Sequence, residues 1–356
     1  MPAIFTHALL SLPFIGAYAI FALGIVVIYR ASRVLNLAHG AMAVVPAYVA
    51  DSLVRSGVPI GLALIVAVAF GAGLGVAVEW GFVRRLRAQG PTAQTVGTVA
   101  VTGLLIALTG KIWGTTPKIA PSVFPQGTIK IESSGLLYGD IGLFVTAVLV
   151  AAGMFAFFKR TEVGLAMRGA AQNRRAASLM GINPDLAASA AWALGGGLAA
   201  LAGVMLAAVT NLDPYTLSLQ VLPAFVAALV GGLESLPGAL WGATVAGLAF
   251  GIVPYFKETP LIGWIARQNG SAQLVLTVLT LVVMMTRGKR LAGVEASHSG
   301  LVSSTRPPRV AGSSAGRGWL LILVPLLALP WIAGFTVLQD SLLAMQLAIV
   351  AMSVVV

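Results

Sequence analysis

The sequence predicts an all-α fold, a polytopic bundle of transmembrane helices, and three observations lead to this prediction. Of the 356 residues, 58% are hydrophobic and only 9% are charged, whereas soluble domains carry about one quarter charged residues. Apolar stretches of about 20 residues, the length needed to cross a bilayer, recur along the chain. Basic residues stand in short segments between these stretches, which is the pattern of cytoplasmic loops.

The apolar stretches predict about eight spans in residues 1–290 and about two after residue 318. The first group of windows is 9–29, 34–54, 60–83, 94–113, 140–158, 185–210, 238–256 and 271–286, and the second is 319–336 and 339–356. A shorter apolar piece, 221–233, either crosses the bilayer or forms half of a broken helix whose irregular backbone lines a cavity. Between the two groups, residues 291–318 are rich in Ser, Gly, Pro and Arg, which is typical of a flexible linker. Close helix packing is predicted by glycines at small-xxx-small spacing, namely Gly71/Gly75, Gly238/Gly242 and Gly247/Gly251.

The basic residues also predict how the chain is oriented. They form four clusters, namely Arg30 with Arg33, Arg84 with Arg85 and Arg87, Lys159 through Arg175, and Arg287 through Arg317. Because basic loops stay on the cytoplasmic side, placing all four there leaves Met1 outside and makes 114–139 an external loop. The N-terminal MPAIFTH has no basic n-region, and arginines follow the first span in place of a cleavage site, so we expect that span to be retained.

Several classes of site are missing from the sequence. There is no cysteine, and the three histidines, His7, His39 and His298, are too scattered for a metal cluster, so we expect no cofactor. The net charge of +11 comes from loops between apolar spans, so it does not indicate nucleic-acid binding. Gly110 and Lys111 lack the surrounding residues of a Walker A loop, and there is no nucleophile elbow or zincin motif. The chain is therefore not predicted to be an enzyme, and ATP-driven work would need a separate ATPase chain.

A polar segment of helix-forming composition interrupts the apolar pattern at residues 159–183. It reads KRTEVGLAMRGAAQNRRAASLMGIN and is rich in Ala and in basic residues. We expect one helix, with Arg168, Arg174 and Arg175 on one side and with Leu165, Ala166, Ala170, Ala177 and Leu179 available to pack elsewhere. Such a helix at the cytoplasmic face either docks a soluble partner or lies on anionic lipid headgroups.

Polar side chains also lie in or next to the spans. Asn36 and His39 belong to RVLNLAHGAM, directly after the first basic cluster. Because polar side chains at membrane depth are costly, the two either form a helix–helix hydrogen bond or line a translocation pathway or gate. Glu234, in the turn GGLESLPG, is a candidate for the inner mouth of such a pathway. Glu79 is expected to pair with a nearby arginine.

Four stretches, in this order, resemble the membrane permease of the branched-chain amino acid ABC importers. They are RVLNLAHG (33–40), TEVGLAMRGAAQNRRAASLMGIN (161–183), GGGLAALAGVM (195–205) and FVAALVGGLESLPGALWGA (225–243). The resemblance covers most of residues 8–290. It implies a substrate-conducting subunit in the plasma (inner) membrane of a prokaryote, which works by alternating access. The implied partners are ABC ATPase subunits, an extracytoplasmic substrate-binding protein and a second permease domain.

The resemblance also implies roles for particular residues. Segment 161–183 is similar to the short helix that sits in a groove of the ATPase and couples ATP-driven closure to transport. Its matching positions are Gly164, Arg168, Ala170, Arg174, Arg175, Ala176 and Gly181. Because residues 319–356 are similar to the beginning of the second permease, we expect a permease domain at 1–290, a linker at 291–318 and a fused second permease domain from residue 319.

Three functions are compatible with these features. The leading one is a permease for branched-chain or similar amino acids, and the second is the same type of permease for urea, amides or another small polar solute. The substrate stays open because Ala41 stands where the family commonly has Glu, and Glu234 stands where it often has Gly. The third is an ATPase-independent secondary transporter or channel, which predicts ionisable residues near the bilayer midplane. Asp51, Glu79 and Lys111 instead fall near predicted span ends.

Overall fold

The computed structural model describes residues 3–131, 134–258, 263, 267 and 271–282. The chain divides into two units, residues 1–276 and 277–356, and the fold described below is that of the first unit. The predicted linker at 291–318 and the predicted second permease domain at 319–356 lie outside the described residues.

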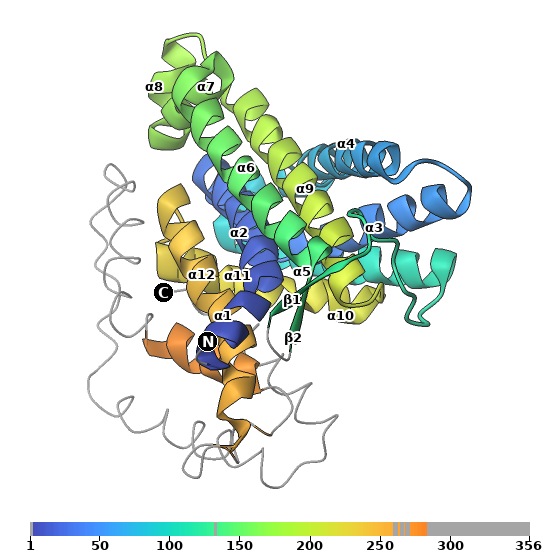
Figure 1. Ribbon diagram of the computed structural model, residues 1–356. Coiled ribbons are helices and arrows are strands. Elements are labelled where there is room, and N and C mark those ends of the chain that lie inside the picture. Colours follow the sequence, from blue (N-terminus) through green and yellow to red (C-terminus); the bar gives the residue numbers. More distant parts are fainter. Residues whose placement is uncertain (1–2, 132–133, 259–262, 264–266, 268–270, 283–356) are drawn as a thin grey trace, which may run out of the picture. The chain divides into compact units, whose positions relative to one another are not determined.

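The first unit is built almost entirely of helices (Figure 1). The described residues contain six helices long and apolar enough to cross a membrane, namely α2 (Leu12–Ser32), α4 with its π-helical end (Ile60–Val83), α5 (Pro91–Trp113), α6 (Tyr138–Arg160), α9 (Pro184–Val209), and α10 with α11 (Pro214–Gly231). The shorter helices are α1 (Ala3–Leu10), α3 (His39–Arg55), α7 (Glu162–Gln172), α8 (Arg174–Leu179), α12 (Leu236–Ile252) and the 3-10 helices Arg87–Gln89 and Val253–Glu258. A further apolar helix, Ser271–Val282, follows in the sequence. The predicted all-α membrane fold is confirmed.

Strand structure is confined, among the described residues, to the segment predicted as an external loop. Strands β1 (Thr128–Ile131) and β2 (Ser134–Leu137) pair antiparallel, with Thr128 opposite Leu137. This hairpin precedes α6, whereas α7 and α8 follow the other end of α6 (Figure 1). The hairpin and the α7–α8 segment therefore mark opposite ends of the unit.

Of the eight windows predicted in residues 1–290, those at 34–54 and 238–256 correspond to the 17-residue helices α3 and α12, and the described part of 271–286 is the short helix Ser271–Val282. The helices at 34–54 and 221–233 also differ in their bounds. The helix predicted at 34–54 begins only at His39, and residues 33–38 form an irregular segment. The short piece predicted at 221–233 is longer, because α10 (Pro214–Leu219) precedes α11 (Val221–Gly231) and the two together reach the length of a membrane-spanning helix. Asp213 explains where this pair begins, since its carboxylate caps α10 by accepting a hydrogen bond from the Thr216 backbone N–H.

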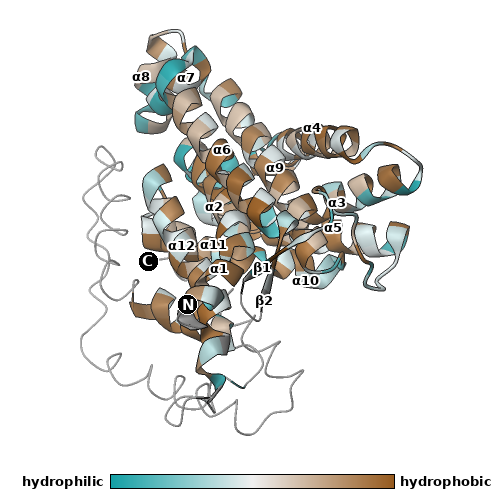
Figure 2. Ribbon diagram, viewed as in Figure 1, coloured by the Kyte–Doolittle hydropathy of each residue, from teal (hydrophilic) through white to brown (hydrophobic). Residues whose placement is uncertain are grey.

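Helix α2 forms the centre of the unit. In its apolar window 83% of the residues are buried, against 22% in α4 and 28% in each of α5 and α6. It packs against α6, α9, α11 and α12. The outer helices α4, α5 and α6 leave large apolar side chains exposed, as expected of helices that face lipid. Figure 2 shows this apolar character along the long helices, whereas hydrophilic residues gather on α7 and α8.

Glycines bring helix backbones into direct contact at several pairs of helices, among them α4–α9 and α11–α12, which confirms the packing predicted from their spacing. In the α4–α9 pair, a Cβ at Gly75 would overlap the carbonyl oxygen of Trp192. In the α11–α12 pair, a Cβ at Gly242 would overlap the carbonyl oxygen of Ala227. Only glycine leaves room for such contacts, so each pair is close-packed without intervening side chains.

Replacing Gly75 with alanine should therefore destabilise the protein. The new methyl group meets backbone, which cannot rotate away, so we expect Gly75→Ala to lower the free energy of unfolding by about 1–3 kcal/mol. Gly73→Ala is the matched control on the same helix, because nothing lies within 4 Å of a Cβ at that position. Thermal unfolding of both purified variants in detergent checks this, and equal midpoints would contradict the α4–α9 contact.

Candidate substrate pathway and coupling surface

The irregular segment 33–38 breaks the chain between α2 and α3 in the interior of the unit, where residues 34–38 are all buried. Its backbone is held by α5. The Leu37 N–H donates to Thr98 Oγ1 at 3.0 Å, and Thr102 Oγ1 donates to the Leu37 carbonyl at 3.2 Å. Irregular backbone at membrane depth is tolerated where protein groups satisfy it, and these two threonines do so.

Asn36 and His39 lie in and next to this segment, and both are buried. Asn36 Oδ1 accepts from the Ala38 N–H at 3.1 Å, and Asn36 Nδ2 lies 3.2 Å from Met42 Sδ. The His39 ring lies between α2 and α3, edge-on to Phe21 with ring centroids 6.0 Å apart. Among the described residues, the hydrogen bonds of Asn36 therefore stay within residues 36–42, and the His39 ring of α3 contacts α2.

Glu234 forms an ion pair with Arg33, at the beginning of the irregular segment. The side chains of Arg33 and Glu234 are 35% and 44% exposed. Both corners have unusual backbone, because Arg33 (φ 57°) and Leu233 (φ 54°) are the only described non-glycine residues with positive φ. Such residues cost free energy and cluster at functional sites. We call this ion pair the corner pair, since it joins the α2–α3 corner to the α11–α12 corner.

Residues 159–183, which were predicted to form one helix, contain two short helices, α7 and α8. The reason is local capping. Thr161, Asn173 and Asn183 each accept a backbone N–H at the beginning of α7, α8 and α9. Asn173 thus interrupts the expected helix in its middle. Gly181, with φ of +82°, turns the chain toward α9 and adopts a backbone conformation that favours glycine.

The structure distributes the residues predicted to contact an ATPase over three environments. Gly164 and Ala170 are buried, Arg168 and Arg174 are half-buried, and Arg175, Ala176 and Gly181 are exposed. Leu165 and Leu179, which we expected to pack elsewhere, are instead 59% and 85% exposed. Together with Val163 and Met180, they make the α7–α8 segment an exposed surface with both basic and large apolar side chains.

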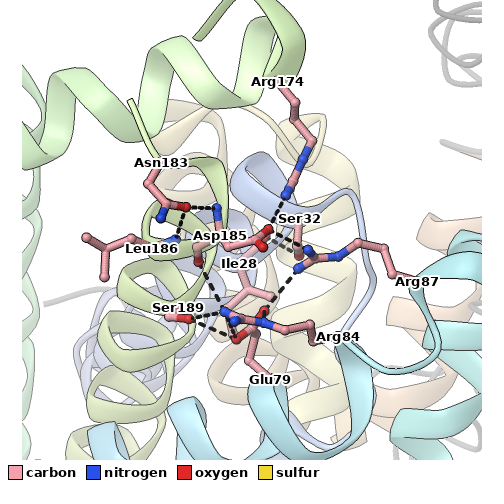
Figure 3. A network of polar contacts seen from close by, with 10 residues as sticks. All are labelled: Ile28, Ser32, Glu79, Arg84, Arg87, Arg174, Asn183, Asp185, Leu186 and Ser189. Atoms are coloured by element: carbon pink, nitrogen blue, oxygen red, sulfur yellow. Dashed lines mark hydrogen bonds and ion pairs between the residues drawn. The ribbon is translucent and has the colours of Figure 1, made fainter. Parts of the chain in front are cut away.

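Glu79 pairs with arginines, as predicted. The carboxylate is buried at the π-helical end of α4, and Arg84 Nη2 lies 3.0 Å from Glu79 Oε2. This hydrogen bond raises the pKa of Arg84 above its ordinary value. Sequence reasoning missed that Arg87 also reaches Glu79 and that Asp185 and Ser189 of α9 join the same network (Figure 3). No spacing in the sequence signals this contact, because it joins residues about a hundred positions apart.

A cavity of about 350 Å³ lies at the hairpin end of the unit, between the segment before β1, the first turn of α6 and the last turns of α9. Phe124, Leu143, Met205 and Val209 give it apolar walls, and Asp140 is the charged residue in its lining. Its size falls in the range of small-molecule sites. Among the described residues, no group of three His, Cys, Asp or Glu side chains is placed to hold a metal ion.

Comparison with known proteins identifies similar membrane proteins. Residues 8–286 match the family described as branched-chain amino acid transport system / permease component. The chain is 25% identical over 285 residues to the high-affinity branched-chain amino acid transport system permease protein LivH of Escherichia coli K12, covering 76% of this chain and 90% of that protein. It is 28% identical over 248 residues to BraD of Pseudomonas aeruginosa, named as the same kind of permease, covering 66% and 81%.

Two further matches were found, one to a curated protein and one to a solved structure. The chain is 28% identical over 272 residues to the probable branched-chain amino acid transport permease protein LivH of Methanocaldococcus jannaschii, covering 74% of this chain and 85% of that protein. Among solved structures, PsaBC from Streptococcus pneumoniae in complex with Fab aligns with a TM-score of 0.43 and 16% identity, over 79% of this chain and 91% of that one.

The contact between α5 and the irregular segment predicts the effect of removing one hydroxyl. Thr98→Val keeps the shape but leaves the buried Leu37 N–H without its acceptor, so we expect a loss of about 1–3 kcal/mol in unfolding free energy. Thr109→Val is the matched control, because Thr109 is equally buried but its hydroxyl bonds only to Leu105 of its own helix. Thermal unfolding in detergent measures both, and a control as unstable as Thr98→Val would contradict the assignment.

Proposed function

Because the chain belongs to the family of branched-chain amino acid transport system permease components, we propose that it is the membrane subunit of an ATP-driven importer for branched-chain or similar amino acids. It would conduct substrate by alternating access and would draw its energy from a separate ATPase. The observation that carries this proposal is the α7–α8 segment, an exposed basic and apolar surface that follows the end of a membrane helix in a chain without a Walker A loop.

The composition of the α7–α8 surface favours a protein partner. Leu179 and Met180, at the end of α8, are 85% and 82% exposed. Large apolar side chains gathered on a surface and surrounded by polar residues indicate an interaction site. A helix that lies on anionic lipid would use the same basic residues, so these residues do not distinguish the two hypotheses. The apolar residues at the end of α8 are therefore the ones to test.

The corner pair is suited to act as an inner gate. It joins two helix corners at the end of the unit where the first basic cluster lies, and both corners carry left-handed backbone. Because its side chains are partly exposed, the pair contributes only about 0–1 kcal/mol, so it can open and close during each cycle. Asn36 and His39 follow Arg33 in the irregular segment and at the beginning of α3, and a gating role for them remains a proposal.

The positions of buried carboxylates argue against an ion-coupled secondary transporter. Ion coupling places ionisable residues near the bilayer midplane. Among the described residues, the buried carboxylates all lie at or near helix ends, namely Asp51, Glu79, Asp140 and Asp213. Asp51 and Glu79 are, in addition, paired with arginines. For an ATP-driven permease, the proposed partners are ABC ATPase subunits, an extracytoplasmic binding protein and a second permease domain.

Replacing the exposed apolar side chains of α8 should abolish ATPase docking. We expect Leu179→Ser combined with Met180→Ser to lose the ATPase from detergent pull-downs of the full-length protein and to abolish uptake, because the docking contact is apolar. Ile119→Ser is the control, since Ile119 is 84% exposed but lies in the loop after α5.

Two results would overturn this proposal. One is an ATPase that is retained by the double variant as well as by the control, and the other is an unmodified chain that takes up substrate with no ATPase bound. Uptake of L-leucine, urea and acetamide is measured in proteoliposomes that contain the unmodified protein with its ATPase. The solute that is taken up distinguishes an amino acid permease from a urea or amide permease.

The gate proposal predicts that fixing the corner pair stops transport. The chain has no cysteine, so Arg33→Cys with Glu234→Cys introduces the only two thiols. We expect a short bis-methanethiosulfonate reagent to stop uptake in this variant and a reductant to restore it, because the corners can no longer separate. Each single-cysteine variant is the control for the reagent. Uptake that continues in protein shown by mass to be crosslinked would rule out a gate at this position.

A further inference from the structure

A row of ion pairs connects α8 with the loop after α4 and with the beginning of α9 (Figure 3). Arg174 Nη2 lies 2.6 Å from Asp185 Oδ1, and Arg87 Nη1 lies 2.5 Å from the same oxygen. The other terminal nitrogen of Arg87, Nη2, lies 3.0 Å from Glu79 Oε1. One guanidinium thus bridges two carboxylates from different helices. We call Arg174, Asp185, Arg87 and Glu79 the ion-pair row.

Burial increases from the outer pair, Arg174 and Asp185, through Arg87 to Glu79. The side chains of Arg174 and Asp185 are 41% and 45% exposed, that of Arg87 is 32% exposed, and that of Glu79 is 1% exposed. Glu79 is also fixed by other donors, since Ser189 Oγ donates to Glu79 Oε2 at 2.8 Å. A buried carboxylate that lost one of these donors would be strongly destabilised, whereas exposed pairs exchange easily with water. The inner end of the row is therefore held firmly and the outer end weakly.

The two carboxylates of the row belong to helices that pack as one body. The α4–α9 contact is backbone against backbone at Gly75 and Trp192, so no flexible side chain lies between the helices. Glu79 begins the π-helical end of α4, where the Arg84 N–H bonds to the Glu79 carbonyl at 2.7 Å. Single π-helical turns of this kind occur often at functional sites.

The covalent chain connects the α7–α8 segment to α6 on one side and to α9 on the other, but not to α4. The ion-pair row supplies the connection to α4. We propose that Arg87 and Asp185 are positioning residues of the transport cycle, which pass the displacement of α7–α8 by an ATPase to the close-packed α4–α9 pair. This inference rests on the proposed function, because it needs an ATPase that moves α7–α8.

The test compares three arginine variants, each of which removes one positive charge. Arg174→Gln removes the outer link of the row and Arg87→Gln removes both links made by Arg87, while the control Arg85→Gln removes an exposed arginine that forms no ion pair with the described residues. Each full-length variant is reconstituted in proteoliposomes with its ATPase and binding protein. The readouts are ATPase co-purification, ATP hydrolysis and uptake of radiolabelled L-leucine.

We expect the ATPase to co-purify with all three variants and ATP hydrolysis to continue. The ratio of leucine taken up to ATP hydrolysed should fall by about tenfold in Arg87→Gln and Arg174→Gln but not in Arg85→Gln. Arg87→Lys should also lower the ratio, because a single ammonium keeps the charge but cannot bridge both carboxylates as a planar guanidinium does.

Three results would overturn the inference. One is an unchanged ratio in both Arg87→Gln and Arg174→Gln. Another is full restoration by Arg87→Lys, which would make the role of Arg87 one of charge alone. The third is a parallel fall of hydrolysis and uptake together with the amount of folded complex, which would make the row purely structural. Failure of the unmodified chain to bind an ATPase would instead contradict the proposed function, so the two failures are distinguishable.

Discussion

Inside a bilayer each backbone N–H and C=O needs a partner within the protein, and this requirement shapes the break between α2 and α3. Both backbone groups of Leu37 bond to threonine hydroxyls of α5, so the break can exist only while α5 lies beside it. The same contact fixes the directions in which the two helices leave the break. It thereby places Arg33 within reach of Glu234 and His39 against Phe21.

The remaining helices are organised by two kinds of contact with different mechanical properties. Glycine contacts, as between Gly75 and Trp192, join backbones directly and leave nothing to rearrange. Ion pairs at the helix ends join elements through long side chains, and several of them are partly exposed to solvent. Rigid helix pairs joined by ion pairs that can rearrange are suited to a transporter that alternates between two conformations. In such transitions packed elements usually move as rigid bodies relative to one another, without a change in their own packing.

The sequence predicted the helical membrane fold, most of the spans and the glycine-mediated packing, because each depends on local composition and spacing. It predicted the pairing of Glu79 with an arginine for the same reason, since Arg84 lies one π-helical turn away. It did not predict that α3 begins at His39, because the residues before it are apolar and would also suit a helix. It did not predict the bridge made by Arg87, since Asp185 lies far away along the chain.

The sequence by itself determined that this is a membrane protein with a basic segment between two spans, and hydropathy and charge were sufficient for this because a bilayer selects directly on both. Only the tertiary structure decided which arginines are joined to other helices and which are exposed. Arg174 and Arg175 are neighbours of equal charge, yet Arg174 pairs with Asp185 while Arg175 is exposed. The physical reason is the capping by Asn173 and Asn183, which sets the directions of α8 and α9 and so brings Asp185 to one arginine and not to the other.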